Sequence, residues 1–109
     1  MRERAIQNDI LRAFGSKRSM RLWRANVLAA RMGDRFVRAG VAGQADLTGI
    51  LPDGRRIEVE VKSERGRQTE DQRNFQRMIE RFNGVYVLPR SVEDVERTLK
   101  RAGYDVETL

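Results

Sequence analysis

The sequence predicts an α/β domain in which a mixed β-sheet is flanked by helices. Three patterns lead to this prediction. Ile6, Ile10 and Phe14 recur every fourth residue, as on one face of a helix, residues 55–62 alternate apolar and polar side chains, as in a strand, and residues 69–82 return to helical spacing. The 109 residues suit one domain, 1–109, built in layers around a single sheet.

The N-terminal part begins with a helix predicted over residues 3–14, which Gly15 ends. Residues 20–27 alternate apolar and polar side chains and predict a strand with one buried face, into which Trp23 does not fit. Residues 28–44 contain three glycines and several arginines. We expect them to be irregular.

Residues 45–51 and 55–62 predict a hairpin whose loop is Pro52-Asp53-Gly54, because proline and glycine suit successive positions of a three-residue loop. Leu51 then pairs with Arg55, and counting back places Asp46 opposite Glu60. A two-residue Asp53-Gly54 loop would instead place Asp46 opposite Val61, on the other face. We favour the longer loop because proline cannot donate a ladder hydrogen bond.

The C-terminal part predicts a helix over residues 69–82, a short strand over 85–88 and a final helix capped by Ser91. Thr69 and Gln72 have the spacing of a capping box. Apolar side chains mark the inner faces of the two helices: Phe75, Met78, Ile79 and Phe82, then Val92, Val95, Leu99 and Ala102. The predicted order is helix, three strands, helix, strand, helix.

Composition narrows the chemistry that the chain can perform. It contains no cysteine and no histidine, which excludes disulfides, zinc–thiolate sites and histidine bases. The net charge of +6 favours a polyanionic partner, and nucleic acid is the first candidate. No apolar run approaches the roughly 20 residues that span a bilayer, and the N-terminal residues lack a signal-peptide core. We therefore expect no membrane association and an intracellular protein in the cytoplasm of a host cell.

The predicted hairpin brings Asp46, Glu60 and Lys62 onto one face. Two adjacent carboxylates repel unless a cation lies between them, and without histidine they suit Mg²⁺ or Mn²⁺. Such an ion lowers the pKa of bound water, while the lysine can pair with a scissile phosphate. The alternative is an ordinary solvated strand face, on which Glu-x-Glu-x-Lys patterns are common.

Three segments together resemble one known family: 43–50 (GQADLTGI), 57–63 (IEVEVKS) and 66–72 (GRQTEDQ). They are similar to the VRR-NUC (virus-type replication-repair nuclease) family of the PD-(D/E)XK superfamily, in its stand-alone, phage-like form, and the resemblance extends over nearly the whole chain. It implies a restriction-endonuclease-like core of helix, three strands, helix and strand. One departure is Ala45, where the family usually has proline before the aspartate.

The resemblance also implies roles for individual residues. Asp46 and Glu60 would bind the metal with the Val61 carbonyl, and Lys62 would be the catalytic lysine. Two further residues match polar positions of the family's site: Glu3 on the first helix and Gln72 at the start of the second. Each also has a plainer interpretation, since Glu3 lies near the chain start and Gln72 can simply complete a capping box.

Several other residues are candidates for nucleic-acid contacts: Gln7, Arg24, Asn26, Arg67, Arg55 and Arg56. Trp23 can stack on a base or belong to the core or a dimer interface. Three hypotheses follow. The first is a metal-dependent DNA endonuclease, selective for branched or four-way junction DNA and acting as a homodimer, as the resemblance suggests. The second is a non-catalytic nucleic-acid-binding module, and the third is a structural or interaction protein.

Overall fold

The central sheet has four strands in the order β1-β4-β5-β6. Their bounds are Arg21–Arg24 for β1, Leu47–Ile50 for β4, Arg56–Val59 for β5 and Val85–Val87 for β6. β1 and β5 both run antiparallel to β4, whereas β6 runs parallel to β5. The predicted mixed sheet is therefore confirmed. The computed structural model describes residues 2–25, 29–38 and 40–109, with the backbone alone at 29–32 and 36–38.

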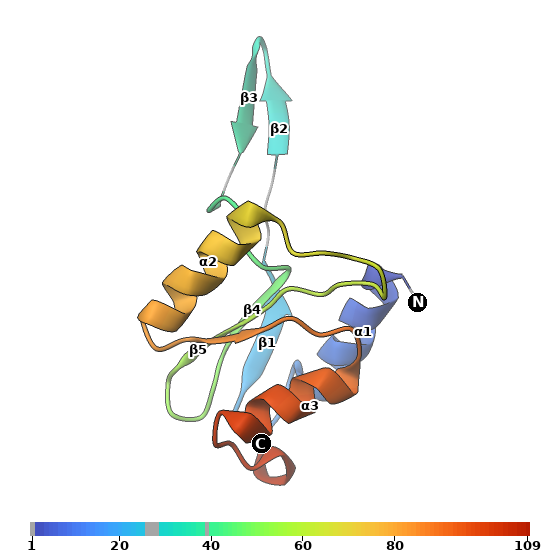
Figure 1. Ribbon diagram of the computed structural model, residues 1–109, viewed down its shortest axis with the longest axis vertical. Helices are drawn as coiled ribbons and strands as arrows, with labels where there is room; N and C mark the ends of the chain where they lie inside the picture. The colour runs from blue at the N-terminus through green and yellow to red at the C-terminus, as the bar shows by residue number, and fades with distance from the viewer. Residues whose placement is uncertain (1, 26–28, 39) are drawn as a thin grey trace.

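Three helices flank this sheet. They are α1 (Glu3–Phe14), α2 (Glu70–Arg81) and α3 (Val92–Arg101), followed by a short 3-10 helix, η1 (Val106–Thr108). Figure 1 shows α2 on one side of the sheet and α1 with α3 on the other. The boundaries of α1 agree with the predicted helix. Within the described residues, no helix combines the length and the apolar character needed to cross a bilayer.

The larger core lies between the sheet and the pair α1 and α3. Ile10 of α1 and Leu99 of α3 are both fully buried there against Ile57 and Val59 of β5. This is the face set by every second strand residue, as the alternation of apolar side chains predicts. The larger core packs against this face of the hairpin β4–β5. The opposite face of the same strands can therefore carry polar groups in fixed positions.

The smaller core lies under α2. Phe75 and Ile79 pack on Tyr86 of β6 and on Ala45, and the rings of Phe75 and Tyr86 meet edge to face at 6.4 Å. Phe82 was expected to join this face, and that prediction is wrong. It follows the last helical residue, and its side chain is 72% exposed.

Residues 28–44 were expected to be irregular, and this prediction is wrong in part. β2 (Ala29–Met32) and β3 (Arg35–Arg38) pair antiparallel as a separate two-stranded sheet. Met32 pairs with Arg35, so the loop is Gly33-Asp34, and Gly33 has a φ of +63°. A glycine followed by aspartate is a known signal for a two-residue hairpin loop. In Figure 1 this hairpin projects from the domain near the N-terminal end of α2.

Candidate active site

The register of the hairpin β4–β5 places the two key acids opposite each other. Leu47 pairs with Val59, and beyond the strands the Leu51 N–H donates to the Arg55 carbonyl at 2.9 Å. Gly54 has the positive φ, +88°, that closes a three-residue loop. Continuing the same register by one residue brings Asp46 opposite Glu60. The alternative two-residue loop is therefore excluded.

The Asp46 carboxylate is held by the backbone of the neighbouring strand. Its Oδ2 accepts a hydrogen bond from the Val61 N–H at 2.9 Å. The Asp46 carbonyl in turn accepts from the Ala25 N–H at 2.9 Å, which continues the β1–β4 ladder. Asp46 is thus fixed between the ends of three strands. The loop before it is also close to α2, because a Cβ on Gly43 would lie 2.2 Å from the Asp71 carbonyl oxygen.

Glu60 and Lys62 do not lie on a solvated strand face. Glu58, Glu60 and Lys62 are 0%, 4% and 8% exposed and are the buried charged residues of the described chain. Burial of charged side chains is rare unless they are paired or bind a metal. Three ionisable side chains are therefore buried on the side of the sheet that α2 also occupies.

Gln72 connects the start of α2 to the acid pair. Its Oε1 accepts from the Thr69 N–H at 2.9 Å, while its own N–H donates to Thr69 Oγ1 at 3.1 Å, which completes the predicted capping box. The same side chain donates from Nε2 to Glu60 Oε2 at 3.1 Å. The two roles foreseen for Gln72, capping and facing the site, are therefore compatible and both present.

The two oxygens of Glu60 have different surroundings. Oε2 accepts from Gln72 and lies 3.7 Å from Lys62 Nζ. Oε1 is buried and has no hydrogen-bond partner among the described residues. A buried carboxylate oxygen without a partner carries a substantial desolvation penalty. A bound cation would satisfy this oxygen, and among the described residues Glu58 Oε1 is the other buried carboxylate oxygen without a partner.

The pKa values of both acids are displaced upward. Burial, followed by the charge of Asp46, raises the pKa of Glu60 to about 8. Burial likewise raises the pKa of Asp46, although its hydrogen bond from the Val61 N–H opposes this. The nearby charge of Asp46 disfavours ionisation of Glu60, so it adds to the upward shift of the Glu60 pKa. Two opposing carboxylates in a buried site therefore favour the protonated form of Glu60 when no cation is bound.

Glu3 lies at the edge of this site. Its Oε1 accepts from the Ser63 N–H at 3.4 Å, and its charge raises the pKa of both Asp46 and Glu60. It is half-buried rather than frayed. Within the described part of the chain, however, no group of three or more acids is arranged to hold a metal. Glu3 thus lies beside the acid pair.

No protein-family model, curated protein or solved structure matches this chain. Function is therefore inferred from the residues of the site.

The donor set at Asp46 and Glu60 fits a hard divalent ion. Carboxylate and carbonyl oxygens are the ligands that Mg²⁺ and Mn²⁺ prefer. Within the described part of the chain Glu60 Oε1 has no partner, and the Asp46 carboxylate lies against the backbone of Val61. Asp46, Glu60 and the Val61 carbonyl are therefore the groups that could hold such an ion, with Lys62 beside them.

The predicted nucleic-acid contacts are not all brought to this site. Gln7 is half-buried on α1, one turn after Glu3. Arg67 is exposed in the loop before α2. Arg24 pairs opposite Leu47, so it points to the α1 side of the sheet, where its guanidinium donates to Asn8 Oδ1. That places Arg24 on the face opposite the acids. Asn26 lies outside the described residues.

Sequence reasoning missed two residues that shape the site. Arg90 donates from Nη1 and Nη2 to the carbonyls of Ser63, Glu64 and Gly66, which fixes the loop after Lys62. Tyr86 lies on the same face as the acids, with its hydroxyl accepting from Gln68 at 3.3 Å. Burial raises the pKa of Tyr86 to about 12. Neither residue had a local signal, because both act across long stretches of chain.

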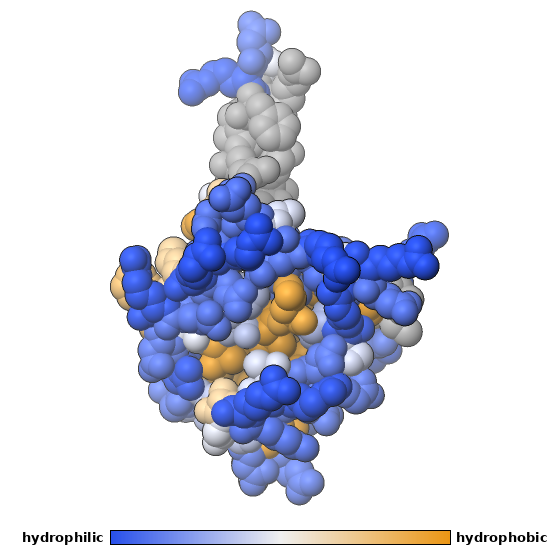
Figure 2. Space-filling model, in the orientation of Figure 1, coloured by the Kyte–Doolittle hydropathy of each residue, from blue (hydrophilic) through white to orange (hydrophobic). Residues whose placement is uncertain are grey.

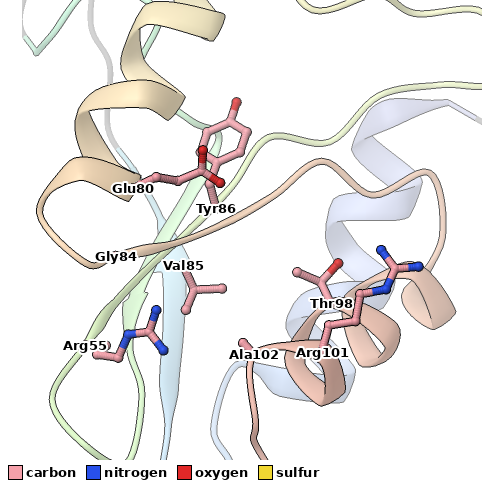
Figure 3. A pocket seen from close by; sticks show the side chains of 8 residues that line it. All are labelled: Arg55, Glu80, Gly84, Val85, Tyr86, Thr98, Arg101 and Ala102. Carbon is pink, nitrogen blue, oxygen red and sulfur yellow. The ribbon is translucent and has the colours of Figure 1, made fainter.

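A hollow of about 260 Å³, separate from the acid pair, lies between α2, β6 and α3. Figure 2 shows hydrophobic side chains at the centre of this face, surrounded by hydrophilic ones. The lining residues are Arg55, Glu80, Gly84, Val85, Tyr86, Thr98, Arg101 and Ala102 (Figure 3). Arg55 is already engaged there, since its Nε donates to the Asn83 carbonyl at 2.7 Å. The hollow does not include the acid pair.

Proposed function

We propose that this chain is a metal-dependent nuclease that hydrolyses phosphodiester bonds in DNA. The observation that carries the proposal is the pair Asp46 and Glu60, opposite each other across β4–β5, with one buried Glu60 oxygen unpartnered and Lys62 adjacent. Acids that face a polyanion weaken its binding unless a cation lies between them. A pure binding module would have no reason to bury them beside a lysine.

The residues of the site have distinct roles in the proposed reaction. A divalent ion such as Mg²⁺ or Mn²⁺ would supply a Lewis acid for the phosphate and lower the pKa of the attacking water. The Val61 N–H fixes Asp46, and Gln72 holds Glu60 Oε2 so that Oε1 stays available. Water adds to phosphorus, the bond to the leaving oxygen breaks, and that oxygen takes up a proton. The Lys62 ammonium stabilises the charge that develops on the phosphate.

The proposal includes the resemblance to the VRR-NUC family and its PD-(D/E)XK core. The order α1, β1, β4, β5, α2, β6 supports it, with the β2–β3 hairpin as an insertion after the first strand. As the resemblance suggests, we also propose a homodimer that selects branched or four-way junction DNA. Two copies place two sites on two strands, as cutting a junction requires. Sedimentation equilibrium measures whether the chain forms the proposed dimer.

The decisive experiment is cleavage of a labelled four-way junction and a matched linear duplex with Mg²⁺, Mn²⁺ or EDTA. We expect the wild type to cut with either ion and not with EDTA. Lys62→Ala and Asp46→Asn should each lower the cleavage rate by about 100-fold or more, the range seen when one charge-stabilising group is removed. The junction-to-duplex ratio then measures substrate selectivity.

Glu93→Gln is a matched control for loss of an acid. Glu93 is exposed on α3, on the side of the sheet away from the acid pair. This variant should cut at the wild-type rate. If the wild type binds DNA but cuts with neither ion, the nuclease proposal fails and the chain is a binding module.

A further inference from the structure

The sheet face that carries the acid pair continues beyond it in ordered rows. Cross-strand partners from β1, β4 and β5 share this face, and the register gives three rows: Ala25, Asp46 and Glu60, then Trp23, Thr48 and Glu58, then Arg21, Ile50 and Arg56. Successive rows are about 7 Å apart, since each is two strand residues along. This spacing is comparable to one nucleotide of an extended strand.

α2 covers only part of this face. Its buried side chains Phe75 and Ile79 pack on Tyr86 of β6 and on Ala45. The β1–β4 part remains open, because Trp23 is 52% exposed and Ile50 is 47% exposed. Trp23 and Ile50 are diagonal neighbours on this face, and contiguous exposed apolar surface marks binding sites. Of the core, dimer and stacking roles considered for Trp23, the core role is therefore excluded.

Trp23 is held in a fixed position relative to the acid pair. It lies opposite Thr48, whose hydroxyl donates to the buried carboxylate of Glu58. Asp46 is two residues from Thr48 on the same strand, so Trp23 and Asp46 are diagonal neighbours about 7–8 Å apart. A base attached to a phosphate at the acid pair can therefore reach the indole ring.

The charge of the next row is complementary to a nucleic-acid backbone. Arg56 donates from Nε to Glu58 Oε2 at 3.2 Å, while its side chain remains 57% exposed. The guanidinium is thus anchored at one nitrogen and faces solvent beside Ile50. An anion that follows the rows from Asp46 past Trp23 meets this cation next. Acid pair, aromatic ring and arginine thus lie in successive rows, so a strand whose phosphate is at the acid pair can place a base at Trp23 and a later phosphate at Arg56.

We propose that Trp23 is a stacking platform for an unpaired nucleobase next to the scissile phosphate, with Arg56 contacting a phosphate further along the same strand. This inference rests on the proposed nuclease function and specifies its substrate class as nucleic acid with unpaired nucleotides at the cut. Bases inside a duplex are already stacked on both faces and are not available to an aromatic side chain. The exposed indole therefore selects single-stranded or splayed segments over fully paired DNA.

The chain offers a direct test, because Trp23 is its one tryptophan. The intrinsic fluorescence of the full chain is measured in EDTA, which prevents cleavage, during titration with oligo(dT) or with a blunt duplex. We expect saturable quenching by oligo(dT) and none by the duplex. Quenching that is absent with oligo(dT), or equal with the duplex, overturns the inference.

Variants test the same contact by the affinity for a labelled oligo(dT), measured by anisotropy. Trp23→Ala should weaken this affinity by about 5- to 150-fold, the usual value of one base–aromatic stack, and leave duplex affinity unchanged. Trp23→Phe should restore most of the lost affinity. Phe82→Ala is the matched control, because Phe82 is also an exposed aromatic, at 72%, but lies at the end of α2. Equal losses for Trp23→Ala and Phe82→Ala overturn the inference.

Two further outcomes separate this inference from the proposed function. If oligo(dT) quenches Trp23 but no substrate is cut with Mg²⁺ or Mn²⁺, the platform stands and the nuclease proposal fails. If wild type and Trp23→Ala cut a splayed duplex at the same rate, the nuclease proposal stands and the platform is overturned. Fluorescence that shifts with protein concentration in the absence of DNA assigns Trp23 to a second copy of the chain, which also overturns the inference.

Discussion

Glu60 concentrates most of the chemistry of the site in one side chain. Its Oε2 is satisfied by Gln72 and lies near Lys62, whereas its Oε1 has no partner among the residues that the structure describes. The carboxyl is 4% exposed and faces Asp46. At the scale of single residues, the site is therefore arranged around one oxygen that the protein itself leaves free.

This arrangement predicts how stability depends on pH without a divalent ion. The pKa of Glu60 rises from its usual 4.5 to about 8 on folding, so the folded state binds the proton more tightly than the unfolded state. The corresponding stability is fully present below about pH 4.5 and is lost as pH rises through 8. In EDTA, denaturant unfolding should therefore show lower stability at pH 8.5 than at pH 6.

Glu60→Gln should remove this dependence, because glutamine cannot ionise. In EDTA at pH 8.5 the variant should be more stable than the wild type by about 1–3 kcal/mol, the cost of an unsatisfied buried polar group. Mg²⁺ should stabilise the wild type at this pH by mass action and leave the variant nearly unchanged. The interpretation fails if wild type and variant respond equally to pH and to Mg²⁺.

At the scale of elements, the start of α2 serves both the fold and the site. Thr69 and Gln72 exchange hydrogen bonds that satisfy free N–H groups at the helix end, and Gln72 also reaches Glu60. The helix therefore fixes Glu60 through the same residue that fixes its own first turn.

Two substitutions should separate these two roles. Thr69→Ala removes the cap and should cost about 1 kcal/mol of stability, with cleavage nearly unchanged. Gln72→Met removes the cap partner and the donor to Glu60. It should lower stability similarly but reduce cleavage by about 10- to 100-fold, as expected for a residue that orients a metal ligand. Unfolding curves and cleavage rates measured on both variants check this contrast. Similar cleavage by the two would show that the contact with Glu60 has no catalytic role.

The elements also show where local sequence signals suffice. Helix α1 was predictable from its apolar periodicity, and helix α2 and the β4–β5 loop from capping and turn residues that act on their own backbone. The β2–β3 hairpin was missed although its Gly33-Asp34 loop is such a signal. The surrounding alanines and arginines do not alternate as a half-buried strand does. A hairpin in a sheet of its own has less need of that pattern.

At the scale of the whole molecule, the net charge of +6 predicts a salt-dependent affinity for nucleic acid. The logarithm of the binding constant should fall linearly with the logarithm of salt concentration, by about 0.7 per phosphate for single strands and 0.9 for duplex. A titration at several salt concentrations measures this slope. A slope near zero would favour the third hypothesis, a structural or interaction protein.

The same titration with Asp46→Ala tests whether the acid pair faces the bound phosphate. In EDTA the variant lacks one of two acids that face the phosphate, so it should bind DNA at least as tightly as the wild type. With Mg²⁺ present, cleavage should be lost while binding is retained. Weaker binding by Asp46→Ala in EDTA would show that the acid pair is not where the polyanion lies.

The sequence by itself determined the pairing of Asp46 with Glu60, because Pro52 and Gly54 set the loop length and the two-residue period of a strand does the rest. Only the tertiary structure decided which faces are covered. In the folded chain Glu58, Glu60 and Lys62 are buried, although the sequence allowed them to be solvated. The open β1–β4 part leaves Trp23 exposed. Coverage depends on contacts between elements distant in the chain, and these leave no local pattern.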